Sequence, residues 1–292
     1  MKKISIILSV VLFAAAGWAE NKTVDRLYVL DCGIGYASNK SLWTNGMEVG
    51  VPWQIAGNCY LVKHGNDYFL WDTGISDDVA SMPNGWQASG GPYGIRWTRS
   101  KTLASELAKV GVKPADIHWI GISHAHSDHV GNVEHFPNSV VYIQKAEYLR
   151  TFAIGPENPA VMQPIGQPPA QTWFSFRGDH AVKLVEGDTD VFGDGSVIIV
   201  FTPGHTPGHQ SCLIHLANTG WVLLSGDAVH MQANWDNRRV PRFASLTDEN
   251  KDRTLLSMQR MADLMSFYKA QLWISHDLEQ TKKQKHAPEF YD

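Results

Sequence analysis

The stretch Ser123-His124-Ala125-His126-Ser127-Asp128-His129 places three imidazoles and one carboxylate within six consecutive positions, 124–129. It directly follows an apolar segment, residues 117–122, that is typical of a buried β-strand. Side chains two positions apart along an extended segment point the same way, so His124 and His126 can bind one metal ion. Asp128 and His129 follow where the chain turns and can reach a second ion. Because a zinc site requires about four donors, further ligands must come from elsewhere in the chain.

Three later segments each place a potential metal ligand just beyond a predicted strand. They are His205 and His209 after strand 197–201, Asp227 after strand 221–224, and His276 after strand 271–274. A rigid sheet can hold a loop residue accurately where a strand ends. We therefore expect these segments to meet the 123–129 stretch and to complete a site for two metal ions.

The elements around these segments form two halves, each with strands and helices. Predicted strands occupy residues 27–30, 58–63, 68–71, 117–122, 140–144, 183–185, 197–201, 211–216, 221–224 and 271–274. Predicted helices occupy residues 103–110 and 145–151 and a long segment that starts near Asp248 and carries a Leu- and Met-rich stripe. Two strand-rich halves, each flanked by helices, predict an α/β fold of the layered αββα sandwich type. Residues 82–94 and 154–169, rich in Gly or Pro, are predicted to be long loops.

The first nineteen residues have the pattern of a secretory signal peptide. Lys2 and Lys3 give a positive start, residues 4–16 form an apolar core, and Gly17-Trp18-Ala19 offers a small-x-small cleavage site. This apolar run is shorter than the roughly 18 residues that a spanning helix needs, so we expect no stable membrane span after cleavage. The prediction is a signal peptide at 1–19 and a single domain at 20–292, secreted or periplasmic. A retained N-terminal anchor is the alternative.

The charge of the chain argues against a polyanionic partner. There are 25 Lys and Arg against 29 Asp and Glu, which gives a formal net charge of −4. Loss of Lys2 and Lys3 with the signal peptide would make this charge −6, and the sequence contains no dense basic cluster to offset it. We therefore expect a small-molecule partner and no nucleic acid.

The three cysteines do not suggest a disulfide framework. Cys32, Cys59 and Cys212 are odd in number, so at most one pair can form. Cys59 and Cys212 lie in apolar, strand-like runs and are expected to act as small buried side chains. We expect no disulfide, with a Cys32–Cys59 bridge as the less favoured alternative.

Taken together, the ligand motifs resemble those of the metallo-β-lactamase superfamily. The motifs are His124-x-His126-x-Asp128-His129, Thr-Pro-Gly-His205, Gly-Asp227 and His276, and the resemblance extends from about Leu27 to the C-terminus. It implies an αββα sandwich of the metallo-β-lactamase type, with residues 20–292 as one hydrolase domain.

The resemblance also implies a role for each ligand. One ion would bind three histidines, His124, His126 and His205. The other would bind Asp128, His129 and His276. Asp227 would bridge the two ions, and Asp72 in the motif Trp71-Asp72-Thr73-Gly74 would orient ligands. His209 would have a supporting or packing role.

The implied chemistry is hydrolysis by water held between two cations. Two divalent ions about 3.5–4 Å apart lower the pKa of a shared water, which gives hydroxide near neutral pH. One ion polarises a carbonyl oxygen and stabilises the developing negative charge, and Asp128 could pass a proton to the leaving alkoxide. Zn is the expected metal, and Fe, Co and Mn suit the same donors. An ester, lactone, amide or phosphoester could be the substrate.

Differences between subfamilies favour the N-acyl homoserine lactonase group. β-Lactam-hydrolysing subclasses commonly carry Cys or Ser at the position of Asp227, and thioesterases of the glyoxalase II type continue with a helical domain after the last ligand. The resemblance to the lactonases includes the stretch 202–211, the ending Ser275-His276-Asp277-Leu278-Glu279-Gln280 and Pro288-Glu289-Phe290-Tyr291. It implies opening of N-acyl homoserine lactones by an exported enzyme, which would quench bacterial signalling.

One position departs from the pattern of that group. Its well-known members carry a Tyr three residues after the bridging Asp, where the phenol contacts the substrate carbonyl oxygen, whereas this chain has His230. His230 is therefore a candidate catalytic residue that could donate the same hydrogen bond, and a purely structural role is the alternative. The alternative enzymes are related exported hydrolases of organophosphate triesters, aryl esters or β-lactams. A non-catalytic metal-binding protein is disfavoured because the ligand set is intact.

Overall fold

The computed structural model describes residues 22–44, 46–87, 94–152, 180–241 and 251–292. The predicted signal peptide and the predicted loop 154–169 lie outside the described residues. Among the residues described, there is no helix whose length and apolar character would let it cross a membrane.

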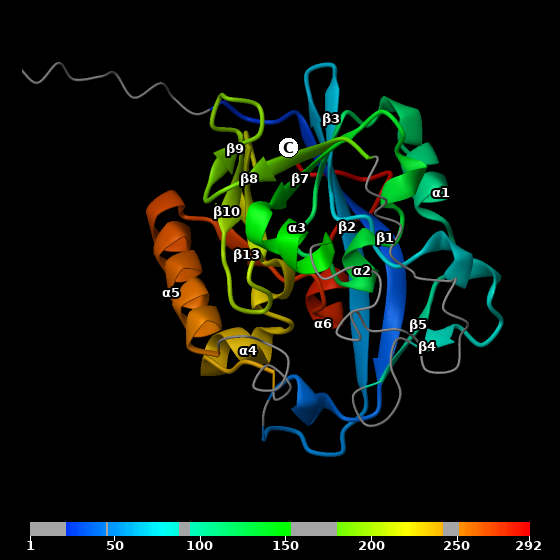
Figure 1. The fold of residues 1–292 in the computed structure, drawn as a ribbon, viewed down its shortest axis with the longest axis vertical. Coiled ribbons are helices and arrows are strands. Elements are labelled where there is room, and N and C mark those ends of the chain that lie inside the picture. Colours follow the sequence, from blue (N-terminus) through cyan, green and yellow to red (C-terminus); the bar gives the residue numbers. More distant parts are fainter. Residues whose placement is uncertain (1–21, 45, 88–93, 153–179, 242–250) are drawn as a thin grey trace, which may run out of the picture.

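An eight-stranded sheet forms one central layer, in the order β4-β5-β1-β2-β3-β6-β7-β8 (Figure 1). Its strands are β1 (Arg26–Ala37), β2 (Trp53–His64), β3 (Asp67–Trp71), β4 (Trp86–Gln87), β5 (Ile95–Thr98), β6 (Trp119–Gly121), β7 (Val140–Gln144) and β8 (Val182–Val185). The pairs from β4 to β3 are antiparallel, whereas β3, β6, β7 and β8 are parallel neighbours. The carboxyl ends of these parallel strands therefore share one edge of the sheet.

A five-stranded sheet forms the second central layer, in the order β13-β12-β11-β10-β9. Its strands are β9 (Thr189–Asp190), β10 (Val197–Phe201), β11 (Gln210–Leu216), β12 (Gly220–Leu224) and β13 (Gln271–Trp273). β13 pairs with β12 in parallel, and the remaining pairs are antiparallel.

Helices surround the two sheets. They are α1 (Leu103–Ala108), α2 (Ser127–Val130), α3 (Lys145–Phe152), α4 (Gln232–Asn237), α5 (Lys251–Tyr268) and α6 (Leu278–Thr281). Short 3-10 helices occupy Lys40–Leu42, Asp77–Ser81, Pro114–Asp116, Val133–His135 and Gly226–Ala228. Figure 1 shows α5 along the outer side of the second sheet and α1 beside the first.

Alternating side chains of the central strands build separate cores on the two faces of the first sheet. Tyr60 and Trp71 pack between the sheets, in the same cluster as Ile214 of the second sheet. Their neighbours Leu61 and Leu70 point the other way and join the α1 side chains. This period of two is what a strand covered on both faces requires, and each fully buried Leu contributes roughly 1.5–3 kcal/mol of transfer free energy.

The outer face of the second sheet is covered by α5. Met258 and Met261 are fully buried against Leu213 and Leu223. The predicted apolar stripe of the long helix is therefore a packing surface, and Leu256 on another face of the helix is exposed. With helices on both outer faces, the order of layers is the predicted αββα sandwich.

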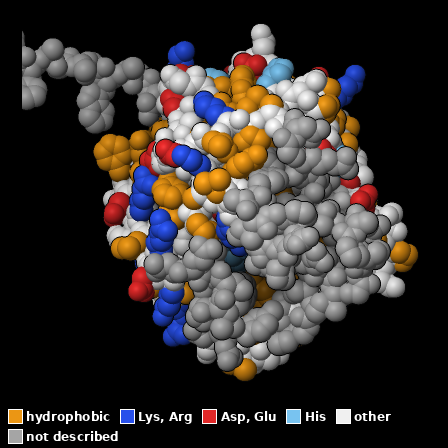
Figure 2. Space-filling model, in the orientation of Figure 1, with side chains coloured by type: hydrophobic (Ala, Val, Ile, Leu, Met, Phe, Trp, Pro, Cys, Tyr) orange, Lys and Arg blue, Asp and Glu red, His pale blue; other side chains and the backbone are white. Residues whose placement is uncertain are grey.

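The charged surface of the α5 side is mixed in sign. Figure 2 shows Lys and Arg side chains along this side, interspersed with acidic and apolar ones. This distribution agrees with the low net charge of the sequence.

A polar contact joins the two sheets beside the histidine-rich loop. The backbone amide of Gln210 in β11 donates to Ser123 O at 2.9 Å. Its side-chain Nε2 donates to Ile122 O at 2.7 Å. Because Ile122 and Ser123 lead directly into His124, these bonds fix the start of that loop relative to the second sheet.

Two sequence expectations need correction. Residues 82–94, predicted as a loop, contain β4, which pairs with the equally unpredicted β5. Cys32 and Cys59, expected to be unbonded, form a disulfide with a Cα–Cα distance of 6.0 Å. The reason is the pairing of β1 with β2, which places Cys59 opposite Leu30, two residues from Cys32 on the same face of the sheet. Cys212 is buried and unbonded, as expected.

Candidate metal centre

The predicted ligands sit where strands end. His124 and His126 follow β6, and His126 is the N-terminal cap of α2, whose four residues include Asp128 and His129. The remaining three follow strands of the second sheet: His205 after β10, Asp227 in the 3-10 helix after β12, and His276 after β13. The structure brings all seven together in two groups of potential ligands.

The first group is called here the three-histidine pocket and consists of His124, His126 and His205. His126 Nδ1 lies 2.8 Å from His124 Nε2 and 3.0 Å from His205 Nε2. His124 Nε2 and His205 Nε2 are 3.2 Å apart. Donors of a tetrahedral zinc site with ordinary Zn–N bonds are separated by about 3.3 Å. The three nitrogens therefore already occupy positions close to one face of such a tetrahedron.

The second group is called the mixed pocket and consists of Asp128, His129 and His276. Asp128 Oδ2 lies 3.7 Å from His129 Nε2 and 3.5 Å from His276 Nε2. The Asp128 side chain is 15% exposed, whereas the Asp227 side chain is only 5% exposed. Asp128 is thus the more accessible of the two carboxylates.

Asp227 connects the two pockets through its two oxygens. Asp227 Oδ2 lies 3.3 Å from His205 Nε2 and 3.7 Å from His124 Nε2. Asp227 Oδ1 lies 3.0 Å from His276 Nε2 and 3.3 Å from His129 Nε2. Each oxygen therefore faces a different pocket, which is the arrangement that a carboxylate shared by two ions requires.

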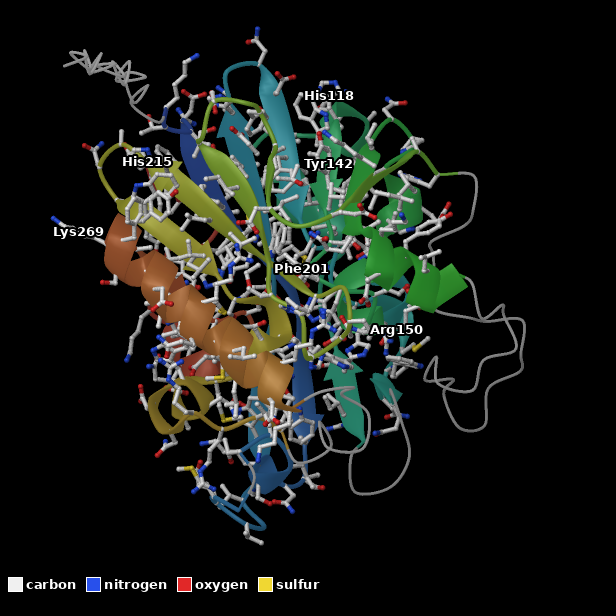
Figure 3. The ribbon with its side chains drawn as sticks, turned by 60° about the vertical axis from the view of Figure 1, so that its left-hand side comes forward. His118, Tyr142, Arg150, Phe201, His215 and Lys269 are labelled. Carbon is white, nitrogen blue, oxygen red and sulfur yellow. A yellow bond between two sulfur atoms is a disulfide. The ribbon has the colours of Figure 1, made fainter. Side chains whose placement is uncertain are left out.

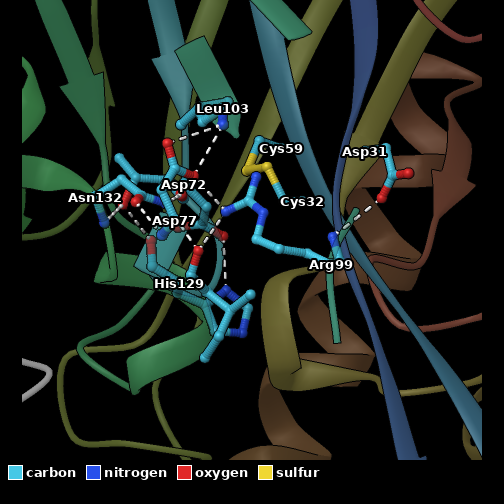
Figure 4. Close-up of a disulfide and its surroundings, with 12 residues drawn as sticks. Asp31, Cys32, Cys59, Asp72, Asp77, Arg99, Leu103, His129 and Asn132 are labelled. Carbon is cyan, nitrogen blue, oxygen red and sulfur yellow. Dashed lines mark hydrogen bonds and ion pairs between the residues drawn. A yellow bond between two sulfur atoms is a disulfide. The ribbon is translucent and has the colours of Figure 1, made fainter. Parts of the chain in front are cut away.

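Asp72 holds His129 in the orientation that the mixed pocket needs (Figure 4). Asp72 Oδ2 lies 2.8 Å from His129 Nδ1, so the opposite ring nitrogen points into the pocket. Both Asp72 oxygens also accept from Ser123, from its amide at 2.7 Å and its hydroxyl at 2.8 Å. An imidazole whose outer nitrogen donates to a carboxylate has its tautomer fixed for metal binding.

Backbone carbonyls fix two further imidazoles. His276 Nδ1 lies 2.7 Å from Ala56 O, which leaves its Nε2 facing Asp227. His209 Nδ1 lies 2.9 Å from Thr202 O, and His209 Nε2 accepts from the Asp227 amide at 2.8 Å. His209 therefore holds the backbone of Asp227 through the Asp227 amide and does not face either pocket.

The three-histidine pocket keeps its imidazoles neutral. Burial holds the pKa of His124 and of His205 well below the usual 6.5. Burial, followed by the charge of Arg150, lowers the pKa of His126 to about 3. Neutral imidazoles have free lone pairs, which is the protonation state that binds metal.

The mixed pocket has the opposite electrostatics. Burial alone would lower the pKa of His129, but the carboxylates of Asp227, Asp72 and Asp128 raise it well above 6.5. The pKa of His276 is also raised, because Asp227 outweighs the effect of burial. These two imidazoles hold protons that a metal ion would displace.

The residues present fit two divalent cations. Asp227 Oδ1 and His129 Nε2 are buried and have no hydrogen-bond partner among the described residues. Buried polar atoms normally find a partner, and these two lie 3.3 Å apart at the mixed pocket. Nitrogen and carboxylate donors suit Zn and similar transition metals. The cluster therefore has the donor chemistry and the unmet bonding capacity of a site for a metal pair.

His230 lies beside both pockets. Its Nε2 is 3.2 Å from Asp227 Oδ2, and its ring centroid is 5.1 Å from that of His205 and 5.8 Å from that of His276. The side chain is buried, and its Nδ1 has no hydrogen-bond partner among the described residues. The structure thus places His230 close enough to act on a molecule bound at the metal centre.

Sequence reasoning missed part of the surrounding support. The disulfide lies under the loop that carries Asp72, because a Cβ added to Gly74 would come within 2.9 Å of Cys32 Sγ and 3.1 Å of Cys59 Sγ. Glu147 of α3 was also missed, although it is fully buried beside two ligand loops. An acidic residue in the first turn of a helix is common for electrostatic reasons, so no local pattern marks this position.

Comparison with known proteins gives consistent matches. Residues 52–264 match the family described as the metallo-beta-lactamase superfamily. The N-acyl homoserine lactonase AttM of Azorhizobium caulinodans is 29% identical over 274 residues, which cover 91% of this chain and 98% of the relative. The N-acyl homoserine lactonase of Bacillus cereus is 30% identical over 283 residues, which cover 92% and 99%.

A solved structure shows the same architecture. It is an N-acyl homoserine lactone hydrolase with the product N-hexanoyl-L-homoserine bound at its catalytic metal centre. The TM-score is 0.76 at 25% sequence identity, and the match covers 92% of this chain and all of the other. These matches confirm the predicted fold and the predicted resemblance to the lactonase group.

Proposed function

The chain belongs to the metallo-β-lactamase superfamily and is a metal-dependent hydrolase of the lactonase type, and from that premise we propose that it opens the ring of N-acyl homoserine lactones after export from the cell. The observation that carries the proposal is the position of Asp227, whose two oxygens face separate groups of ligands. That arrangement occurs in a chain that aligns over nearly the whole length of N-acyl homoserine lactonases.

Different side chains have different roles in the proposed reaction. Bound at the two pockets, a pair of divalent ions would supply a hydroxide near neutral pH and polarise the substrate carbonyl. The seven ligands fix where this occurs, with Zn as the proposed metal. Asp128, the more exposed carboxylate, accepts the proton of the hydroxyl group that has added to the carbonyl carbon and passes it to the alkoxide oxygen that leaves when the ring opens. His230 donates a hydrogen bond to the carbonyl oxygen, in place of the family's tyrosine.

Two features support export. Residues 1–19 have the pattern of a signal peptide. The Cys32–Cys59 disulfide is the kind of bond that persists outside the reducing cytosol. Export would bring the enzyme to lactone signals outside the cytoplasm and would quench signalling between cells.

The test uses the 20–292 form, prepared with Zn and analysed for metal content. A pH-based assay then compares an N-acyl homoserine lactone with a phosphotriester, an aryl ester and a cephalosporin. We expect about two metal ions per chain and the highest kcat/KM on the lactone. A higher kcat/KM on any other member of the panel would overturn the proposed substrate. Cell fractionation tests export, with the protein in the periplasm or medium as the expected result.

A further inference from the structure

A buried carboxylate outside the ligand set joins the loops that carry the three-histidine pocket. Glu147 Oε1 accepts from the amide of Ala125 at 3.0 Å, and Oε2 accepts from the amide of Gly208 at 3.1 Å. Ala125 is the residue between His124 and His126, and Gly208 follows three residues after His205. One side chain therefore bonds to both segments that supply this pocket, from opposite halves of the sequence.

The surroundings of Glu147 show that this contact is built into the packing. The residue is fully buried, and Arg150 Nη1 lies 3.2 Å from Oε1, which compensates the negative charge. Arg150 belongs to α3 and is labelled in Figure 3. A Cβ added to Gly208 would clash with the backbone and side chain of Glu147, so only glycine allows the loop to approach this closely.

We propose that Glu147 is a positioning residue for the three-histidine pocket, which holds the two ligand loops at the separation that one metal ion requires. A hydrogen bond to the Ala125 amide fixes the peptide from which His124 and His126 project. The bond to Gly208 fixes the loop of His205 relative to that peptide. Asp72 does the same for the mixed pocket through a ring nitrogen, whereas Glu147 acts through backbone amides. The inference rests on the metal centre of the proposed function and is independent of the substrate.

Glu147→Gln is the direct test, because glutamine keeps the shape of the side chain but replaces one acceptor oxygen by an NH2 group. That group would face a backbone amide donor, and one of the two loops would lose its bond. The affinity of the three-histidine pocket for Zn should fall about 10–100-fold, as when other residues that support metal ligands are changed. The mixed pocket should keep its affinity.

The chain offers a matched control in Glu106. It is also fully buried in a short helix and also pairs with a cation three residues later, since Lys109 Nζ lies 2.6 Å from its Oε2. Its Oε1, however, has no hydrogen-bond partner among the described residues, so it does not join the ligand loops in this way. Glu106→Gln thus reports the effect of losing a buried negative charge without any effect on the loops.

The measurement is Zn retention by wild type, Glu147→Gln and Glu106→Gln during dialysis against increasing EDTA. At intermediate EDTA we expect two Zn per chain in wild type and Glu106→Gln but one in Glu147→Gln. X-ray absorption should then find two imidazoles on the remaining Zn, those of His129 and His276. Equal retention in all three proteins, equal loss in both variants, or three imidazoles on the remaining Zn would overturn the role of Glu147.

A second variant covers the case in which Glu147→Gln does not fold. Glu147→Asp keeps the negative charge but shortens the side chain, so it cannot reach both amides. It should show the same loss of one Zn, and retention of both would contradict a positioning role. Wild type that binds no Zn would instead overturn the metal centre itself, and an inactive wild type that binds two Zn would overturn only the proposed substrate.

Discussion

The three-histidine pocket and the mixed pocket lie on either side of Asp227 and are built from different chemistry. The first presents three imidazoles that burial keeps neutral. The second presents two imidazoles whose pKa values are raised by nearby carboxylates. Their supports differ too, since Glu147 bonds to backbone amides around the first and Asp72 bonds to a ring nitrogen in the second. The difference teaches that two adjacent groups of potential metal ligands can have their protonation states and their supports set separately.

Removal of the shared carboxylate should weaken metal binding at both pockets and so remove the difference between them. Asp227→Asn keeps the shape of the side chain but loses the negative charge that both pockets use, so both should bind metal more weakly. We expect kcat/KM for lactone opening to fall about 10³-fold, since the electrostatic stabilisation is lost. Elemental analysis and the pH-based assay measure the two effects. The exposed Asp263→Asn on α5 is the control, and wild-type metal content and rate in Asp227→Asn would contradict a bridging role.

Substitution of His230 tests whether activity can be lost while both pockets keep their metal. His230→Ala removes the proposed hydrogen bond to the carbonyl oxygen, so kcat should fall about 100-fold, as for other donors to a developing oxyanion. Metal content should stay at the wild-type value, because the seven ligands are unchanged. Loss of metal in this variant would instead make His230 a ligand or a structural residue.

Asp72 should affect the mixed pocket more than the three-histidine pocket, because it contacts the His129 ring directly but reaches His124 only through Ser123. In Asp72→Asn one acceptor oxygen and the charge are lost, so the hold on His129 is weakened. The affinity of the mixed pocket should fall about 10–100-fold. X-ray absorption of the form with one Zn should find three imidazoles, the reverse of the result expected for Glu147→Gln. Two imidazoles would contradict the assignment of Asp72 to the mixed pocket.

The features that could be predicted follow from local sequence patterns, whereas the missed features depend on contacts between residues far apart in the sequence. The ends of β6, β10, β12 and β13 were predictable because each strand is a short apolar run that stops at a ligand motif. All seven ligands and Asp72 lie on such local patterns, and the resemblance to a known family assigned their roles. The structure brings these residues together as predicted.

The missed features depend on which residues meet after folding. The disulfide depends on the pairing of β1 with β2, which places Cys59 opposite Leu30 and near Cys32, and no local pattern reveals this register. β4 and β5 are short strands that pair with each other at the edge of the sheet, and their sequence lies in a Gly-rich region. Glu147 bonds to amides of two distant segments, which a single sequence cannot show.

The pH dependence of metal binding should also differ between the pockets. The raised pKa of His129 stabilises the folded, metal-free chain below about pH 6.5, and this contribution is lost as the pH rises through the raised value. Zn must displace that proton, so mixed-pocket affinity should rise with pH by roughly tenfold per unit per proton at pH values below the raised pKa of His129. Three-histidine affinity should change little, and chelator competition at several pH values measures both. Equal slopes of Zn affinity against pH for the two pockets would contradict the predicted difference in their electrostatics.

The most direct test of a shared, two-ion site is stepwise reconstitution. Metal-free 20–292 protein is titrated with Zn while bound metal and the rate of N-acyl homoserine lactone opening are recorded together. The rate should stay low through the first equivalent and rise to its maximum as the second binds, because Asp227 must serve both pockets. Full activity with one Zn per chain would contradict the shared, two-ion site.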